Sequence, residues 1–267
     1  MGNQTQIAAP PAKDRAATEA APSGKDARKK ENKGVLGFVR SVAPALAIAL
    51  GIRAFLFEPF SIPSGSMLPT LQIGDYVVVS KFAYGVRIPF TNQMLWQAAT
   101  PERGDVIVFE RPTVQPETLI KRVIGLPGET VSIRDGVVVI DGQPQARSLL
   151  ERDYGFDDFD EHRGRWRAAS ADLYTENLSR GDGAGHPHFV MEQLHGQPAQ
   201  GPWRVPEGAV LVFGDNRDNS ADSRVFGFVP LGHIRGRADV VGFSWGKDGL
   251  RTDRILRGLD SRVPEGS

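Results

Sequence analysis

Beyond residue 58, the apolar residues of this chain occur in short segments that glycine and proline separate. The 267 residues include 30 glycines and 19 prolines, which favours many turns. Asp135-Gly136, a dipeptide typical of a two-residue hairpin turn, joins two of these segments. The pattern predicts a mainly β domain, built from sheets or from an open barrel. The predicted strands are Tyr76–Val79, Val106–Phe109, Thr118–Ile124, Val131–Ile133, Val137–Ile140, Ala209–Phe213 and Val240–Trp245.

The strand pattern fades between Gln143 and Pro206. The stretch at 153–160 is acidic and aromatic, and the stretch at 181–188 is loop-like. We therefore predict an inserted, less regular β cap domain at residues 130–206. The core then consists of residues 58–129 and 207–258, and residues 259–267 form a short tail.

The histidines of the predicted cap are His162, His186, His188 and His195. A metal site is the tempting interpretation, but Pro187 interrupts the central pair and no carboxylate stands nearby at helical spacing. The chain has no cysteine, which excludes disulfides, Cys-based zinc sites and a thiol nucleophile. We predict histidines in surface loops, no metal site and no cofactor.

The first 57 residues differ in character from the rest. Residues 1–33 are rich in alanine, proline and lysine, and predict a disordered basic tail. Segment 34–57 is apolar and, as a helix, long enough to cross a bilayer, with Arg40 and Arg53 near its ends and Pro44 inside. A basic cluster before a span stays in the cytoplasm, so we predict one transmembrane anchor with all later residues outside. A cleaved signal peptide and a buried helix of the soluble domain are the alternatives.

The turn Glu58–Leu71, with the sequence EPFSIPSGSMLPTL, is suited to presenting a hydroxyl group. Prolines restrict the backbone on both sides, and Gly65 allows conformations closed to other residues. Ser66 is therefore a candidate nucleophile, although an ordinary Ser/Gly/Pro loop has the same composition. Lys+Arg and Asp+Glu both count 32, so the overall charge does not favour nucleic acid as a partner.

A nucleophilic serine needs a base, and no histidine–aspartate pair stands out in the sequence. Lys121 lies on the predicted strand 118–124, where alternation places it on the same face as Leu119 and Val123. Apolar neighbours remove hydration, which lowers the lysine pKa and leaves a neutral amine able to accept a proton. Arg122 faces the other way and can pair with a carboxylate. A lysine with a solvated head is the alternative on this strand alone.

Three longer motifs occur in one order along the chain. They are Ser64–Leu71 (SGSMLPTL), Lys121–Gly128 (KRVIGLPG) and Gly214–Arg224 (GDNRDNSADSR), with RGDV at 103–106 and GFVP at 227–230 beside them. In this combination the sequence resembles the bacterial type I signal peptidases, over residues 50–130 and 207–245.

The resemblance implies a role for each matching residue. Ser66 is the implied nucleophile and Lys121 the implied general base. The Ser64 hydroxyl and the Ser66 backbone N–H form the implied oxyanion hole. Ser220 is implied to orient the lysine. Asp222 and Arg224 are implied to hold that region, and Asp215 is implied to pair with Arg122. Those matching shallow pockets for small side chains at −1 and −3 of the scissile bond are Phe60, Ile62, Met67, Leu71 and Ile120.

The implied protein is a serine endopeptidase of the plasma membrane, with a cytoplasmic N-terminus and its catalytic domain outside. It would remove signal peptides from exported preproteins after residues of Ala-x-Ala type, with signal peptides and the lipid bilayer as partners and no nucleic acid. Its fold would be a β catalytic core with an inserted β cap, after one transmembrane helix. Two alternatives are a self-cleaving SOS-type repressor and a non-catalytic, membrane-anchored β module. The repressors carry a DNA-binding domain where this chain has a basic tail and an apolar segment.

Overall fold

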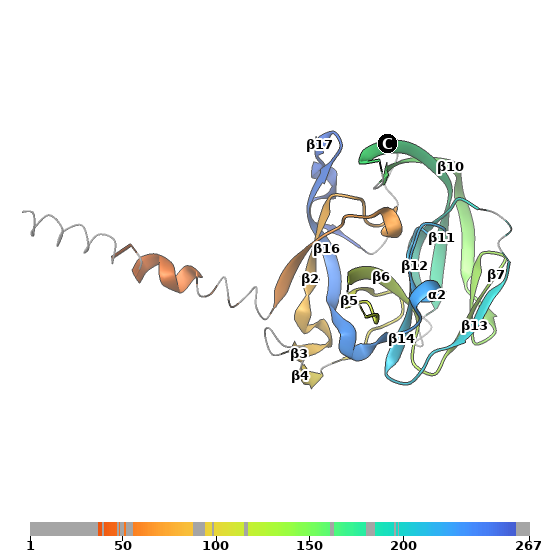
Figure 1. Ribbon diagram of the computed structural model, residues 1–267, viewed down its shortest axis with the longest axis horizontal. Helices are drawn as coiled ribbons and strands as arrows, with labels where there is room; N and C mark the ends of the chain where they lie inside the picture. The colour runs from red at the N-terminus through yellow and green to blue at the C-terminus, as the bar shows by residue number, and fades with distance from the viewer. Residues whose placement is uncertain are drawn as a thin grey trace, which may run out of the picture. The chain divides into compact units, whose positions relative to one another are not determined.

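In the computed structural model, the described residues are 37–38, 40–46, 48, 51, 56–87, 94–97, 99–114, 117–160, 163–179, 185–194, 196 and 198–259 (Figure 1). The chain divides into two units, residues 1–49 and 50–267. In the first unit, residues 37–38, 40–46 and 48 are α-helical. Among the described residues, no helix is both long enough and apolar enough to cross a membrane. The predicted tail 1–33, residues 260–267 and parts of the predicted anchor 34–57 lie outside the described residues.

The second unit is mainly β, as predicted, and is built on one large antiparallel sheet (Figure 1). The short strands β17 (Gly249–Leu250) and β18 (Arg257–Gly258) pair with β16 outside the main order of this sheet. The main order is β1 (Phe57–Ser61), β2 (Asp75–Ser80), β16 (Ile234–Gly246), β5 (Val106–Glu110), β6 (Thr118–Gly125), β14 (Ala209–Phe213) and β15 (Val229–Pro230).

The predicted strands of the core are confirmed, and the last one is longer than expected. The segment Val240–Trp245 is the second half of β16, which begins at Ile234 and pairs with both β2 and β5. The hairpin turn at Asp135-Gly136 is also confirmed. Both residues have positive φ angles, 50° and 76°, as the favoured two-residue turn requires.

Residues 130–204 form two smaller sheets. The four-stranded sheet has the order β13 (Gln200–Arg204), β7 (Thr130–Arg134), β8 (Val137–Ile140) and β9 (Gln143–Pro144). The three-stranded sheet has the order β10 (Ala146–Asp160), β11 (Arg165–Ser179) and β12 (Gly185–Glu192).

The expectation of a less regular segment after Gln143 is wrong, because β10 and β11 are each 15 residues long, and the stretch expected to be loop-like at 181–188 contains the start of β12. The sequence hides these strands for two reasons. Much of β10 is exposed on both faces, so apolar and polar residues do not alternate cleanly. Irregularities between Leu149 and Tyr154, including a positive φ at Asp153, shift the register against β11 and break the period of two.

The remaining elements are short. A two-stranded sheet combines β3 (Gly85–Arg87) with β4 (Met94–Gln97). One α-helical turn, α2 (Ser223–Phe226), follows β14. The 3-10 turns are η1 (Gly65–Met67), η2 (Lys81–Tyr84), η3 (Leu231–His233) and η4 (Thr252–Arg254).

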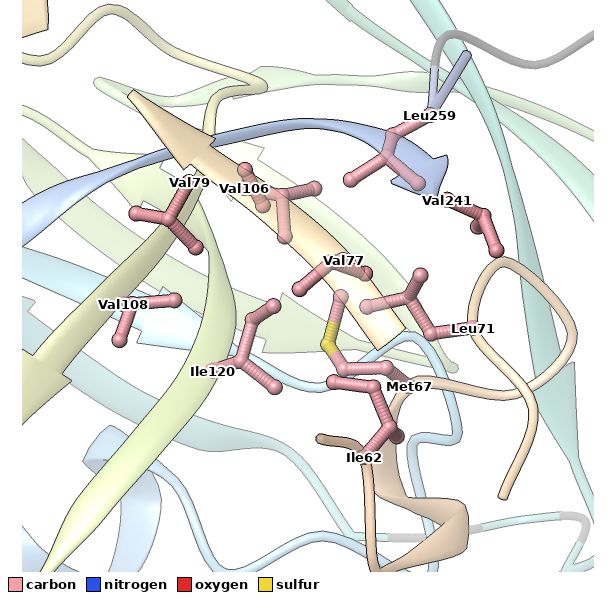
Figure 2. Close-up of a cluster of buried hydrophobic side chains, with 11 residues drawn as sticks. Ile62, Met67, Leu71, Val77, Val79, Val106, Val108, Ile120, Val241 and Leu259 are labelled. Carbon is pink, nitrogen blue, oxygen red and sulfur yellow. The ribbon is translucent and has the colours of Figure 1, made fainter. Parts of the chain in front are cut away.

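The turn η1 lies at the boundary of two apolar clusters. Met67 and Leu71 pack into the main core beside Ile62 and Val77, as Figure 2 shows. The intervening Leu68 belongs to a different cluster, whose buried members otherwise come from β11 and β12: Ala171, Leu173, Phe189 and Met191. Consecutive side chains of this turn therefore anchor it to the core sheet and to the cap sheet at once.

The prediction that the cap histidines lie in surface loops is wrong for His186 and His188, which lie on β12 and are buried. The His186 ring packs on Gly104, where an added Cβ would come within 2.3 Å of it. His188 Nε2 lies 3.3 Å from a carboxylate oxygen of the buried Glu176. The predicted loop placement of His162 and His195 falls outside the described residues.

Candidate active site

The candidate nucleophile, Ser66, is the middle residue of η1 and is only 8% exposed. Tight packing fixes its backbone. A Cβ added to Gly65 would lie 3.0 Å from Leu68 and 3.1 Å from Asp158 of β10, and one added to Gly214 would lie 2.5 Å from the Ser66 carbonyl. Glycine at both positions therefore lets neighbouring segments approach the serine closely.

Strand β6 places Lys121 against this serine. The Lys121 Nζ lies 2.7 Å from Ser66 Oγ and also donates a hydrogen bond of 2.8 Å to the Ile120 carbonyl. Lys121 is 3% exposed, as predicted for the face of β6 that it shares with Leu119 and Val123. This burial excludes the alternative of a lysine whose head is in solvent. The structure thus joins two residues that lie 55 positions apart in the sequence.

Burial lowers the pKa of Lys121 from 10.5 to about 8. The carboxylates of Asp222, Asp215 and Glu117 oppose this change, because they favour the charged ammonium. Loss of hydration outweighs their attraction. A large share of the amine is consequently neutral near pH 8, which is the protonation state that a general base needs.

Ser64 lies on the same loop, immediately before η1. Its Oγ is 3.5 Å from Ser66 Oγ, so the two hydroxyls border one small volume. Ser64 is part-buried, and no hydrogen bond in the described part of the chain caps η1 through its side chain. Its hydroxyl can therefore turn toward a group bound at Ser66.

Arg122 points away from Lys121 and forms a buried ion pair, as its alternate position on β6 predicts. Its Nε and Nη2 donate to the two carboxylate oxygens of Asp215 over 2.9 and 2.7 Å, and Thr70 Oγ1 donates to the same carboxylate over 2.6 Å. Burial alone would raise the pKa of Asp215, but the Arg122 guanidinium keeps it below its usual value. The pair ties the segment after β14 to the strand that carries the lysine.

Asp222 and Arg224 organise the end of that segment. Asp222 accepts a hydrogen bond from the backbone N–H of Gly214 over 2.9 Å and caps α2 by accepting from the N–H of Arg224. Two atoms of the Arg224 guanidinium donate to the same carboxylate, and its Nη2 also donates to the Arg217 carbonyl. These bonds close the loop between β14 and α2.

Ser220 lies inside this loop. Its Oγ is buried and would lie only 2.3 Å from a Cβ added to Gly214, which itself approaches the Ser66 carbonyl. Within the described part of the chain, this hydroxyl has no hydrogen-bond partner. It is therefore an available donor or acceptor close to the serine, and its implied role in orienting Lys121 stays a prediction.

The residues implied to line the substrate pockets also come together. They belong to one apolar cluster beside η1, in which Phe60 is half-buried and the others are buried. The side chains of this cluster are apolar, which suits small uncharged side chains of a substrate better than charged ones. The clustered residues are Phe60, Ile62, Met67, Leu71 and Ile120.

Comparison with known proteins decides the family. A family model described as "Signal peptidase, peptidase S26" matches residues 35–243 of this chain. The chain belongs to the signal peptidase family. A signal peptidase I of Pseudomonas fluorescens is 38% identical over 219 residues, which cover 77% of this chain and 72% of the relative. That of Rickettsia typhi is 33% identical over 225 residues, covering 80% and 83%. A solved signal peptidase I of Enterococcus faecalis is 29% identical, covers 53% of this chain and 98% of its own, and superimposes with a TM-score of 0.29.

As a signal peptidase, the chain is a serine peptidase, and the reaction of its family is signal peptide cleavage. The match therefore excludes the repressor and the non-catalytic β module as classes for this chain. This assignment rests on the sequence matches to the family model and to the relatives, and not on the superposition with the solved structure.

Sequence reasoning missed Asn216, which binds directly to the loop that carries Ser66. Its backbone N–H donates to the Ser66 carbonyl and its Nδ2 to the Gly65 carbonyl, each over 3.1 Å. The side chain is fully buried. Asn216 stands in the Gly214–Arg224 motif, but the carbonyl that its side chain binds lies 151 positions away in the sequence, so no local pattern predicts this contact.

The contact between the cap and the site was also missed. Met191 of β12 exchanges backbone hydrogen bonds with Asp215 and Arg217, on both sides of Asn216. Arg217 in turn pairs with Glu176 of β11, and both are buried. Burial would raise the pKa of Glu176, but Arg217 and His188 keep it below its usual value. No local sequence pattern links these residues, since they come together only through the sheet.

The lowered pKa of Lys121 makes a prediction about stability. An unfolded lysine binds a proton up to pH 10.5 and the folded one only up to about 8, so stability rises with pH across this window. Replacing Lys121 with methionine removes the cost of burying the charge. We expect Lys121→Met to be more stable than wild type by roughly 3 kcal/mol at pH 7, with the difference shrinking as the pH approaches 10.5. Urea unfolding at several pH values measures this.

Lys247→Met is the matched control, because Lys247 is 41% exposed and its ion pair with Asp157 is at the surface. We expect its free energy of unfolding to match that of wild type closely at every pH, because an exposed ion pair contributes little to stability. A Lys121→Met variant no more stable than wild type at pH 7 would contradict the burial of a protonatable amine at this position.

Proposed function

We propose that this chain cleaves signal peptides from exported preproteins with Ser66 as the nucleophile and Lys121 as the general base. The observation that supports this proposal most strongly is the 2.7 Å approach of Lys121 Nζ to Ser66 Oγ, in a buried site that lowers the lysine pKa to about 8. A serine hydroxyl is a weak nucleophile until an adjacent base accepts its proton. A neutral amine at hydrogen-bond distance meets that need without a histidine.

The proposed reaction has two stages. Lys121 accepts the proton of Ser66 as Oγ attacks the scissile carbonyl, and the resulting ammonium donates that proton to the leaving amine. An acyl-enzyme on Ser66 remains. Lys121, neutral again, then accepts a proton from a water molecule that attacks the ester, and returns it to Ser66 as the acid product leaves.

We assign the oxyanion hole to the Ser66 backbone N–H and the Ser64 hydroxyl. Their position on one loop, with the two hydroxyls 3.5 Å apart, supports this assignment. The Arg122–Asp215 pair, Asp222 with Arg224, and Ser220 are proposed as positioning residues. They fix the strand and the loop on either side of the lysine. The amine is thereby held within hydrogen-bond distance of Ser66 Oγ.

We propose small side chains at −1 and −3 of the substrate, of Ala-x-Ala type. The cluster of Phe60, Ile62, Met67, Leu71 and Ile120 supports this, because it is apolar and closely packed and leaves little room beside η1. A purified-protein assay on an Ala-x-Ala precursor tests the proposal. Cleavage at that bond by the wild type, and none by Ser66→Ala, is the expected result.

We also propose that residues 34–57 anchor the protein in the plasma membrane, with residues 58–267 outside the cytoplasm. The apolar segment that follows the basic residues Lys25–Lys33 supports this topology. Protease added to spheroplasts should digest the C-terminal part. A C-terminal part that stays intact until the membrane is lysed would contradict this orientation.

The identity of the base gives a first prediction on catalysis. Lys121→Arg keeps the positive charge, but a guanidinium does not lose its proton in the accessible pH range, so we expect no measurable turnover. For the wild type, only the neutral amine is active, so kcat/KM should rise with pH through an apparent pKa of about 8. Arginine at position 121 with near-wild-type turnover would rule out the Ser/Lys mechanism.

Ser64 gives a second prediction. If its hydroxyl donates to the oxyanion, Ser64→Ala should lower kcat by roughly 10²- to 10³-fold. KM should change little, because the donated charge develops only in the transition state. Ser148→Ala, at an exposed serine of β10, is the control and should keep wild-type kinetics. A loss of affinity at unchanged kcat would instead place Ser64 in contact with the bound substrate.

A further inference from the structure

A groove of about 320 Å³ lies on the cap side of the nucleophile loop. Its floor is formed by Leu68, which directly follows η1, and by Gln72 and Ile73 further along the same loop. One wall is Tyr154–Asp157 of β10 with Trp166 of β11, and the other is Lys247–Arg251, which includes the β16–β17 turn. The reaction proposed above uses none of these residues.

The groove and the proposed −1 and −3 pockets lie on opposite sides of η1. Met67 packs with Ile62 and Ile120 in the core cluster, whereas Leu68 packs with the cap. A peptide that places its small residues over the first cluster and its scissile carbonyl at Ser66 therefore continues past Leu68. Leu68 is on the floor of the groove.

Two strands that line the groove, β10 and β17, each pair with one strand in the described part of the chain. β10 pairs with β11 alone, so one edge of β10 has no strand partner in the described part of the chain. The short β17 likewise pairs only with β16. In Figure 1 the β10 ribbon (green) arches toward β17 (blue), above the orange turn of the nucleophile loop. Unpaired strand edges of this kind bind peptides by adding a strand.

The charges of the groove balance, since Lys247 and Arg251 face Asp157 and Asp248. Arg251 donates to the Gln72 side chain and to the Ile73 carbonyl, which holds the floor in place. The pair of Lys247 and Asp157, 2.8 Å apart, spans the two walls. Both side chains are over 40% exposed, and such pairs cost little to open. Balanced charges and the aromatic side chains of β10 and β11 that line the groove suit chains of varied sequence.

We infer that this groove binds the part of the substrate that follows the scissile bond, as an extended strand along the free edge of β10. The inference rests on the proposed function, because it takes Ser66 as the point of cleavage. It assigns the β10–β11 ribbon and the β16–β17 turn a part in substrate binding, in addition to the apolar cluster on the other side of η1.

Gly155 provides the test. A Cβ added there meets no atom within 4 Å, and its φ is not in the left-handed region, so a large side chain is tolerated in β10. It would share a face with Asp157, whose carboxylate reaches across to Lys247. Gly155→Trp therefore obstructs the groove without touching Ser66 or Lys121. Glu151→Trp, at an exposed residue of the same strand outside the groove, is the matched control.

The experiment compares two Ala-x-Ala precursors of identical leader sequence, one ending about two and one about six residues after the scissile bond. For the wild type, we expect kcat/KM about tenfold higher for the longer peptide, as a few added hydrogen bonds would give. Gly155→Trp should lose this gain and cleave the short peptide at the wild-type rate. Glu151→Trp should keep the gain. Urea unfolding checks that all three proteins are folded.

Two results would overturn the inference: no gain with length in the wild type, or a full gain in Gly155→Trp. A further comparison lengthens the leader side and keeps the mature side constant. If the wild type cleaves the longer leader faster and Gly155→Trp does not, the groove binds the part before the scissile bond, which also overturns the inference. Failure of the wild type to cleave either peptide is distinguishable from these results, because it would overturn the proposed function.

Discussion

The contact between Lys121 Nζ and Ser66 Oγ is the interaction on which the rest of the site depends. It requires an amine that is buried and yet often uncharged, and burial alone moves the lysine pKa far enough for that. Burying a protonatable amine lowers the free energy of unfolding at neutral pH, so the packing around it has to offset that loss. The main core, with Met67 and Leu71 of the nucleophile loop in it, is the part of the structure that does so.

The position of Ser66 depends on contacts from three directions. The core sheet holds the loop through Met67, the cap holds it through Leu68, and Asn216 binds the carbonyls of Gly65 and Ser66. The cap reaches Asn216 as well, through the backbone bonds of Met191. The cap strands therefore contribute to the precision of the site, in addition to any contact they make with substrate.

Prediction from the sequence was reliable where a local pattern carries the information. Short, punctuated apolar segments gave the core strands, and alternation on β6 placed Lys121 and Arg122 on opposite faces before any contact was known. The partners of these residues, Ser66 and Asp215, were implied by the family resemblance of the motifs. Strand alternation did not predict them. Strand alternation predicts which face a residue occupies, but not which distant segment covers it.

The long strands of the cap, β10 and β11, were the part that the sequence could not predict. β10 is exposed on both faces and has an irregular register, so it lacks the alternation that marks a half-buried strand. The burial of His186 and His188 depends on Gly104 and Glu176, which lie on other elements. Histidines in a polar stretch look the same in a sequence whether a sheet buries them or a loop exposes them.

The most direct test of the account is the pKa of Lys121 itself. Lysine labelled with ¹³C at Cε, in the full chain, gives one NMR titration curve per residue, and the Lys121→Met variant identifies the curve that belongs to this site. The account predicts a midpoint of about 8, well below the ordinary 10.5. A Lys121 curve that titrates at the ordinary value would mean that the amine is charged at neutral pH like any solvated lysine, and would contradict its assignment as the general base.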